Sequence, residues 1–188
     1  ITPIRDVCDR HGLKLHLDGA RLFNALVETG DSPAAYGRVF DSISVCFSKG
    51  LGAPVGSILI GEKDFIRKSR RIRKAFGGGM RQAGVLAAAG IHALENNVER
   101  LAEDHHNARE LAAGLSAIEE LDVDMDAVET NMVFVTMDPD RQAKLIDYLK
   151  HRGILAGGYG QLRLVTHHDF SATDIPVVVD AVKTFCAA

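Results

Sequence analysis

Four clusters of charged side chains and glycines are candidates for chemistry. Asp18 ends a short apolar segment and precedes a glycine, and Lys49 follows a second apolar segment in the run Ser-Lys-Gly-Leu-Gly. Open α/β sheets place their functional groups at the carboxyl ends of such strands. Asp18 could also simply cap the helix that follows it, and Lys49 could be an ordinary loop lysine. Neither residue decides the chemistry alone.

The third cluster is cationic. Residues 67–74 contain six arginines and lysines, and the run Gly-Gly-Gly-Met-Arg-Gln follows at residues 77–82. A charge run is usually a solvated helix face, but glycines that lead into a helix N-terminus beside Arg81 can also bind an anion. The run is neither a Walker motif nor a dinucleotide fingerprint, because no Gly-Lys-Ser/Thr follows it and no strand precedes it.

The fourth cluster surrounds Arg163, which lies inside the apolar segment 162–166. A buried arginine is costly unless it is paired, and a ligand carboxylate fits its planar fork. A structural buried ion pair is the alternative. Strand alternation places His167 on the face of Arg163, so both could line one cavity. His105 and His106 fall in a polar helical segment, and we expect them to be exposed.

Together the clusters predict a site for pyridoxal phosphate. Lys49 would form the imine with the cofactor, and Asp18 would keep the pyridine nitrogen protonated so that the ring accepts electrons. The basic, glycine-rich segment would serve the phosphate, and Arg163 would bind an amino-acid carboxylate. We expect no metal site, because the sequence contains no His-x-x-x-His and no Cys-x-x-Cys.

The elements that must position these residues alternate along the chain. The sequence predicts helices at 3–11, 21–28, 62–74, 82–96, 98–118, 139–152 and from Ser171 onward, and strands at 13–17, 42–47, 57–60, 131–137 and 162–166. This order predicts an α/β fold with a mainly parallel sheet, followed by a smaller α/β layer. A boundary near Asn96 divides the chain into domains 1–95 and 96–188.

Composition narrows the class of protein. With 188 residues, 46% hydrophobic and 25% charged, the chain can bury a sizeable core. A net charge of -3 predicts no nucleic-acid partner, and no apolar run approaches the roughly 20 residues of a membrane helix. The three cysteines are too scattered for a disulfide framework, so we expect a reducing, cytoplasmic location.

Four segments carry a family resemblance: HLDGARLFNA (16–25), SVCFSKGLGAPVGS (44–57), GGGMRQ (77–82) and RLVTH (163–167). They resemble low-specificity L-threonine aldolase, a family of fold type I pyridoxal phosphate enzymes within the β-eliminating lyase/threonine aldolase group. The resemblance implies a partial cofactor-binding large domain at 1–95 and a small C-terminal domain at 96–188. It also implies cleavage of L-threonine or L-allo-threonine to glycine and acetaldehyde.

The same resemblance implies roles for single residues. Lys49 is then the Schiff-base lysine, Asp18 pairs with the pyridinium nitrogen, and Arg21 lies near the phenolic oxygen of the cofactor. Arg163 binds the substrate carboxylate. Two further cations belong to the cofactor site, namely Lys74 and Arg81, and the arginine reaches the phosphate in a neighbouring subunit.

The resemblance also implies a homotetramer with shared active sites and a missing N-terminal segment. The family's main phosphate-binding loop and the histidine that stacks on the ring have no counterpart in this sequence. We therefore expect a C-terminal portion that is inactive alone. Two alternatives stay open: another fold type I lyase or aminotransferase, and a truncated, non-catalytic paralogue that acts as an assembly partner.

Overall fold

The computed structural model describes residues 1–188 as two compact units, Ile1–Glu99 (unit 1) and Arg100–Ala188 (unit 2). The expected boundary after residue 95 lies inside the last helix of unit 1, which continues to Asn96. None of the helices combines the length and the apolar character needed to cross a bilayer.

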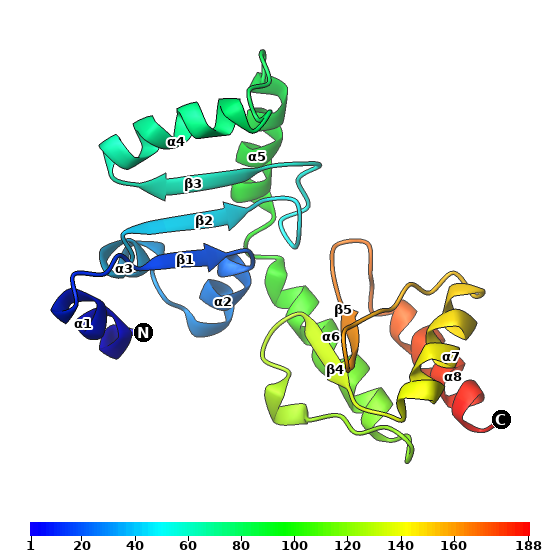
Figure 1. The fold of residues 1–188 in the computed structure, drawn as a ribbon. Coiled ribbons are helices and arrows are strands. Elements are labelled where there is room, and N and C mark those ends of the chain that lie inside the picture. The colour runs from blue at the N-terminus through cyan, green and yellow to red at the C-terminus, as the bar shows by residue number, and fades with distance from the viewer. The chain divides into compact units, whose positions relative to one another are not determined.

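Unit 1 contains a three-stranded sheet and five helices (Figure 1). In chain order they are α1 (Thr2–Arg10), β1 (His16–Gly19), α2 (Leu22–Thr29), α3 (Pro33–Val39), β2 (Ser42–Cys46), β3 (Ser57–Gly61), α4 (Lys63–Ala75) and α5 (Gly84–Asn96). The strand order is β1-β2-β3, and α4 runs alongside β3.

The sheet of unit 1 is mixed. β1 and β2 run parallel, with Asp18 opposite Ser44, whereas β2 and β3 run antiparallel. The mainly parallel prediction therefore holds for β1 and β2 and is wrong for β3. The reason is the short connection at residues 47–56, because a parallel neighbour needs a crossover of a dozen residues or more, usually a helix.

Burial in unit 1 is concentrated around β2. Ile43 and Val45 point into a small core together with Phe47, Leu51 and Ala93. By contrast, every residue of β3 is exposed. Within this chain, other residues therefore bury the side chains of β2 but leave those of β3 accessible to solvent.

Unit 2 packs helices against a two-stranded antiparallel sheet (Figure 1). Its elements are α6 (Leu101–Ser116), the 3-10 turn η1 (Met125–Ala127), β4 (Met132–Val135), α7 (Pro139–Lys150), β5 (Leu162–Val165) and α8 (Asp174–Cys186). Alternate residues of both strands join one hydrophobic core with the three helices, and Val133, Val135, Leu145 and Leu149 are fully buried there.

Three local predictions differ from the structure. The first strand is β1, which lies at residues 16–19 instead of 13–17, and α3 was not predicted. Ser171 does not provide the N-cap of α8, which is Thr173. Instead, the backbone N–H and the hydroxyl of Ser171 both donate to Oδ2 of Asp174, at 2.8 Å each.

Candidate active site

Asp18 is the next-to-last residue of β1, and its side chain is exposed. Its Oδ1 accepts a 3.1 Å hydrogen bond from the N–H of Ala20, which forms a local turn. It does not cap α2, because the N-cap of that helix is Arg21. The second carboxylate oxygen of Asp18 has no partner in the protein, so it is available to a ligand.

Gly19 explains how β1 and β2 come close beside Asp18. A Cβ at Gly19 would lie 2.6 Å from the carbonyl oxygen of Ser44 and 3.2 Å from Cβ of Leu22. No side chain fits there without moving the backbone of β2. The glycine therefore fixes the separation of the two strands whose carboxyl ends carry Asp18 and Lys49.

Lys49 lies in a hydrogen-bonded loop after β2. The N–H of Gly52 donates to the carbonyl of Lys49 at 2.8 Å, and the N–H of Ala53 donates to the carbonyl of Phe47 at 2.9 Å. Nδ2 of Asn97 donates to the carbonyl of Leu51 at 2.8 Å. The backbone of the loop is thus held in place, while the Lys49 side chain is exposed and makes no hydrogen bond or ion pair.

The thiol of Cys46 reports the electrostatics at this end of β2. Burial, the largest influence, raises the pKa of Cys46, but hydrogen bonds with Ser48 and Ser57 and the positive charge of Lys49 lower it. The net pKa lies below the ordinary value for a thiol. The Sγ atom lies 3.3 Å from Oγ of Ser48. The hydrogen bonds from Ser48 and Ser57, with a smaller contribution from the charge of Lys49, therefore outweigh the effect of burial.

Two of the predicted cofactor-binding cations lie at the turn between α4 and α5. Lys74, in the last turn of α4, donates from Nζ to the carbonyl of Gly79 at 3.5 Å. Arg81 is exposed and precedes Gln82, whose φ of 48° lies in the left-handed region. Such backbone is strained for a residue with a side chain, and strained residues cluster at functional sites.

Arg163 lies on the open face of β5, so the expectation that it is buried is wrong. Leu162 and Leu164 alternate with it and point into the core instead. Arg163, Val165 and His167 line an open hollow of about 550 Å³ together with residues 155–159. The guanidinium of Arg163 makes no hydrogen bond or ion pair within this chain.

The loop at residues 155–161 packs closely against β5 beside Arg163. The N–H of Arg163 donates to the carbonyl of Gly157 at 2.7 Å. A Cβ at Gly158 would lie 2.0 Å from the carbonyl oxygen of Gln161 and 3.0 Å from the N–H nitrogen of Arg163. Glycine is thus required where the 155–161 loop folds back against β5.

Three polar residues of α6 are buried in unit 2, namely Asp104, His105 and Asn107. His105 is 1% exposed, which contradicts the expectation that it is exposed, whereas His106 is exposed as expected. The available signal was spacing, because residue 105 shares one helix face with Leu101 and residue 108.

The predicted site residues thus fall into three groups. Asp18 and Lys49 lie at the carboxyl ends of neighbouring parallel strands, with Arg21, half-buried, at the start of α2. The cations of the α4–α5 turn form the second group. Arg163 lies in unit 2 with His167.

Comparison with known protein families identifies the lineage. Residues 1–138 match the family described as β-eliminating lyase. The chain belongs to this family. It is 44% identical over 177 residues to low-specificity L-threonine aldolase 1 of Arabidopsis thaliana, covering 92% of this chain and 49% of the plant protein. It is 46% identical over 175 residues to the low-specificity L-threonine aldolase of Escherichia coli K12, covering 93% and 52%.

The chain therefore spans about half the length of these curated relatives. A Leishmania major threonine aldolase matches with a TM-score of 0.77 at 24% identity, covering 97% of this chain and 55% of that structure. A Sphingomonas wittichii serine palmitoyltransferase matches with a TM-score of 0.73 at 18% identity, covering 96% and 49%. These likenesses confirm the predicted α/β fold, that of the fold type I pyridoxal phosphate enzymes.

Proposed function

We propose that this family member takes part in pyridoxal phosphate-dependent cleavage of L-threonine or L-allo-threonine to glycine and acetaldehyde. The observation that carries the proposal is the pair Asp18 and Lys49, exposed and without ion-pair partners at the carboxyl ends of adjacent parallel strands. The names of the plant and bacterial relatives support the choice of substrate.

The residues present fit pyridoxal phosphate in their chemistry. The cofactor needs an amine, a carboxylate for its ring nitrogen and cations for its phosphate. Lys49 offers a free amine on a fixed loop, and Asp18 offers a carboxylate oxygen without a protein partner. Lys74 and Arg81 offer positive charge, and Arg21 lies close behind Asp18 in the chain.

When bound, pyridoxal phosphate supplies a ring that accepts the electron pair of the bond that breaks. Asp18 would hold the proton on the pyridine nitrogen, and Lys49 would hold the cofactor through its Nζ atom. Arg163 would bind the substrate carboxylate with its planar fork. The Cα–Cβ bond of threonine would break as the β-hydroxyl loses its proton, which releases acetaldehyde, and a proton delivered to Cα would complete glycine.

A second candidate reaction is β-elimination, which the family name favours. Elimination from a β-substituted amino acid such as serine releases pyruvate and ammonia, whereas retro-aldol cleavage of threonine releases an aldehyde and glycine. The same Asp18 and Lys49 would serve both reactions. Product analysis with threonine and serine therefore separates the two candidates.

Covalent labelling tests the proposal directly. The 188-residue chain is incubated with pyridoxal phosphate, reduced with borohydride, digested and mapped by mass spectrometry. We expect the cofactor on Lys49 and a visible absorption band that Lys49→Ala removes. Lys63→Ala, which changes another exposed lysine of unit 1, is the matched control and keeps both signals.

Activity is measured in a chimera in which this chain replaces the matching half of the Escherichia coli relative. We expect threonine-dependent release of acetaldehyde, with a loss of at least about 100-fold for Asp18→Asn because a positioned proton-holding group typically contributes that much. Labelling spread evenly over the lysines, with no preference for Lys49, would overturn the cofactor assignment.

We also propose a cytoplasmic location and a homo-oligomer, a tetramer in which active sites are shared. The three free cysteines support a reducing compartment. Exposed apolar side chains support assembly, and Phe76, 88% exposed beside the α4–α5 turn, is the clearest of them. Light scattering coupled to size-exclusion chromatography measures the mass, and a monomer at all concentrations would contradict the assembly proposal.

A further inference from the structure

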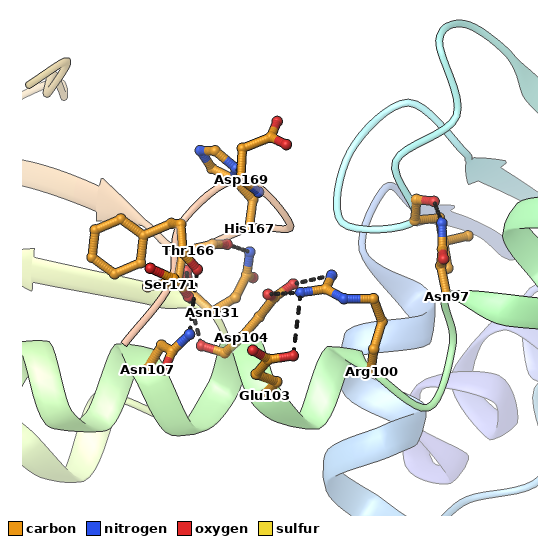
Figure 2. Close-up of polar contacts among 12 residues, drawn as sticks. Asn97, Arg100, Glu103, Asp104, Asn107, Asn131, Thr166, His167, Asp169 and Ser171 are labelled. Carbon is orange, nitrogen blue, oxygen red and sulfur yellow. Dashed lines mark hydrogen bonds and ion pairs between the residues drawn. The ribbon is translucent and has the colours of Figure 1, made fainter. Parts of the chain in front are cut away.

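Hydrogen bonds between buried polar groups connect the end of β5 to α6 and to the residue before β4 (Figure 2). The hydroxyl of Thr166 donates to the carbonyl oxygen of Asp104 on α6 at 2.6 Å. The N–H of Thr166 donates to the carbonyl of Asn131 at 3.0 Å, and Nδ2 of Asn131 donates back to the carbonyl of Thr166 at 2.9 Å. Thr166 is 1% exposed and Asn131 is 2% exposed, so water does not compete for these bonds.

On α6, further hydrogen bonds and an ion pair hold the residues of this network in place. The carboxylate of Asp104, with a fully buried side chain, forms two bonds with the guanidinium of Arg100 at 2.7 and 3.3 Å. One turn further along α6, Nδ2 of Asn107 donates to the carbonyl of Phe170 at 3.3 Å. Helix α6 therefore holds both ends of the turn at residues 166–170, which carries His167.

The network matters because register decides which way Arg163 points. In the observed register Leu162 and Leu164 enter the core, whereas Arg163 and Val165 face the hollow. A shift of β5 by one residue would exchange the two faces and drive the guanidinium into the core. β4 and β5 share only four residue pairs, and a two-stranded sheet is marginally stable without further contacts.

We propose that Thr166 is a positioning residue. Its hydroxyl, together with Asn131, locks the register of β5 against α6 and thereby holds Arg163 and His167 in the hollow in the geometry that binds a substrate carboxylate. This inference rests on the role of Arg163 in the proposed function. It adds hydrogen bonds from Thr166 on the buried side of β5, while Arg163 on the open side of the same strand binds the ligand.

The competing explanation is that Thr166 only fills space. Two substitutions separate the explanations. Thr166→Val keeps the shape and removes the hydroxyl, whereas Thr166→Ser keeps the hydroxyl and removes a methyl group. A lock through the hydroxyl predicts damage from valine and rescue by serine, while a packing role predicts the reverse.

The experiment measures carboxylate binding at Arg163 in the 188-residue chain. The side-chain Nε–Hε signal of Arg163, assigned with Arg163→Lys, is followed by NMR during titration with acetate and with glycine. Each variant is measured well below its melting temperature. We expect Thr166→Val to weaken the apparent Kd at least about fivefold, the equivalent of one hydrogen bond, and Thr166→Ser to stay within about twofold of the wild type.

Thr184→Val is the matched control. The exposed hydroxyl of Thr184, on α8, donates to the carbonyl oxygen of Asp180 at 2.7 Å. The control therefore removes a threonine hydroxyl without touching the network, and we expect no change in Kd. Amide hydrogen exchange at residues 163–167 provides a second readout, and it should accelerate in Thr166→Val alone.

Each outcome is decisive. A folded Thr166→Val chain that binds acetate and glycine like the wild type overturns the positioning role and leaves the role of Arg163 standing. Equal weakening in the valine and serine variants also overturns it, because packing then explains the effect. If the wild-type Arg163 signal responds to neither probe, the carboxylate role in the proposed function fails and the positioning role fails with it.

Discussion

At the scale of single residues, Asp41 is the most heavily engaged carboxylate of unit 1. Its Oδ1 accepts from Nζ of Lys14 at 2.7 Å, and its Oδ2 accepts from Arg5 at 2.7 Å and from the N–H of Leu15 at 2.8 Å. These contacts, with Lys14 first, hold the pKa of Asp41 far below its ordinary range. Asp41 therefore joins α1 and the segment before β1 to the start of β2.

The first prediction concerns Asp41→Asn. Because the pKa of Asp41 is depressed in the folded state, its contribution to stability is present above the unfolded-state pKa of about 4 and declines as the pH falls toward the folded-state value. We expect the variant to melt below the wild type at pH 7 and the gap to narrow steadily below about pH 4. Circular dichroism melts across pH provide the measurement.

Asp6→Asn is the control for Asp41. Asp6 is an exposed carboxylate on α1 that makes no hydrogen bond or ion pair, so its melting curve should follow the wild type at every pH. A gap for Asp41→Asn that stays constant from pH 7 to pH 2 would show that its charge is not the cause.

Residue types and spacing alone single out Asp18 and Lys49 as candidates, and their chemical roles stay predictions. Asp18 ends an apolar segment and Lys49 follows another, and both precede glycines, so the sequence alone indicates the ends of two strands. The sequence does not predict the exposure of Arg163. Alternation along β5 shows which residues share a face of the strand, but it does not show which face packs against the core. The lock through Thr166 was missed because its acceptor, Asp104, lies far away in the sequence and uses a backbone carbonyl.

At the scale of elements, the close approach of β1 and β2 depends on Gly19. A Cβ there would meet the backbone oxygen of Ser44 at 2.6 Å, and backbone cannot swing aside as a side chain can. We predict that Gly19→Ala lowers the free energy of unfolding of unit 1 by about 1–3 kcal/mol through overpacking. Urea denaturation followed by circular dichroism measures the change.

Gly37 supplies the matched control for Gly19. It lies in α3, is exposed, and a Cβ would meet no atom within 4 Å. Gly37→Ala should stabilise the chain by about 0.5–1 kcal/mol, because alanine is the better helix former. If both alanine variants shifted stability in the same direction, the steric argument for Gly19 would fail.

Elements with strong periodicity were predicted well from the sequence. β2, β3, α7 and β5 were placed within two residues at each end, because turn residues and apolar runs bound them. β1 was displaced because Leu13 and Leu15 continue the apolar pattern before the strand begins. α3 is only seven residues long, and a segment that short carries too few turns for helical periodicity to show.

At the scale of the whole molecule, the two units differ in how completely they bury their apolar residues. Unit 2 has one continuous core to which α6, α7, α8, β4 and β5 all contribute. Unit 1 exposes the whole of β3 and large side chains such as Ile72, Phe76 and Val85, at 57%, 88% and 70%. Stability should therefore not be uniform along the chain.

The two units should therefore behave differently when they are separated. A fragment of residues 100–188 should unfold cooperatively alone, because its core is closed, whereas a fragment of residues 1–99 should bind a hydrophobic dye. Within the 100–188 fragment, Leu145→Ala removes a fully buried side chain and should lower the free energy of unfolding by about 2–5 kcal/mol. Leu155→Ala, at a position 83% exposed, is the control and should leave the free energy of unfolding nearly unchanged. A 100–188 fragment that melts without a cooperative transition would show that its core depends on contacts outside those residues.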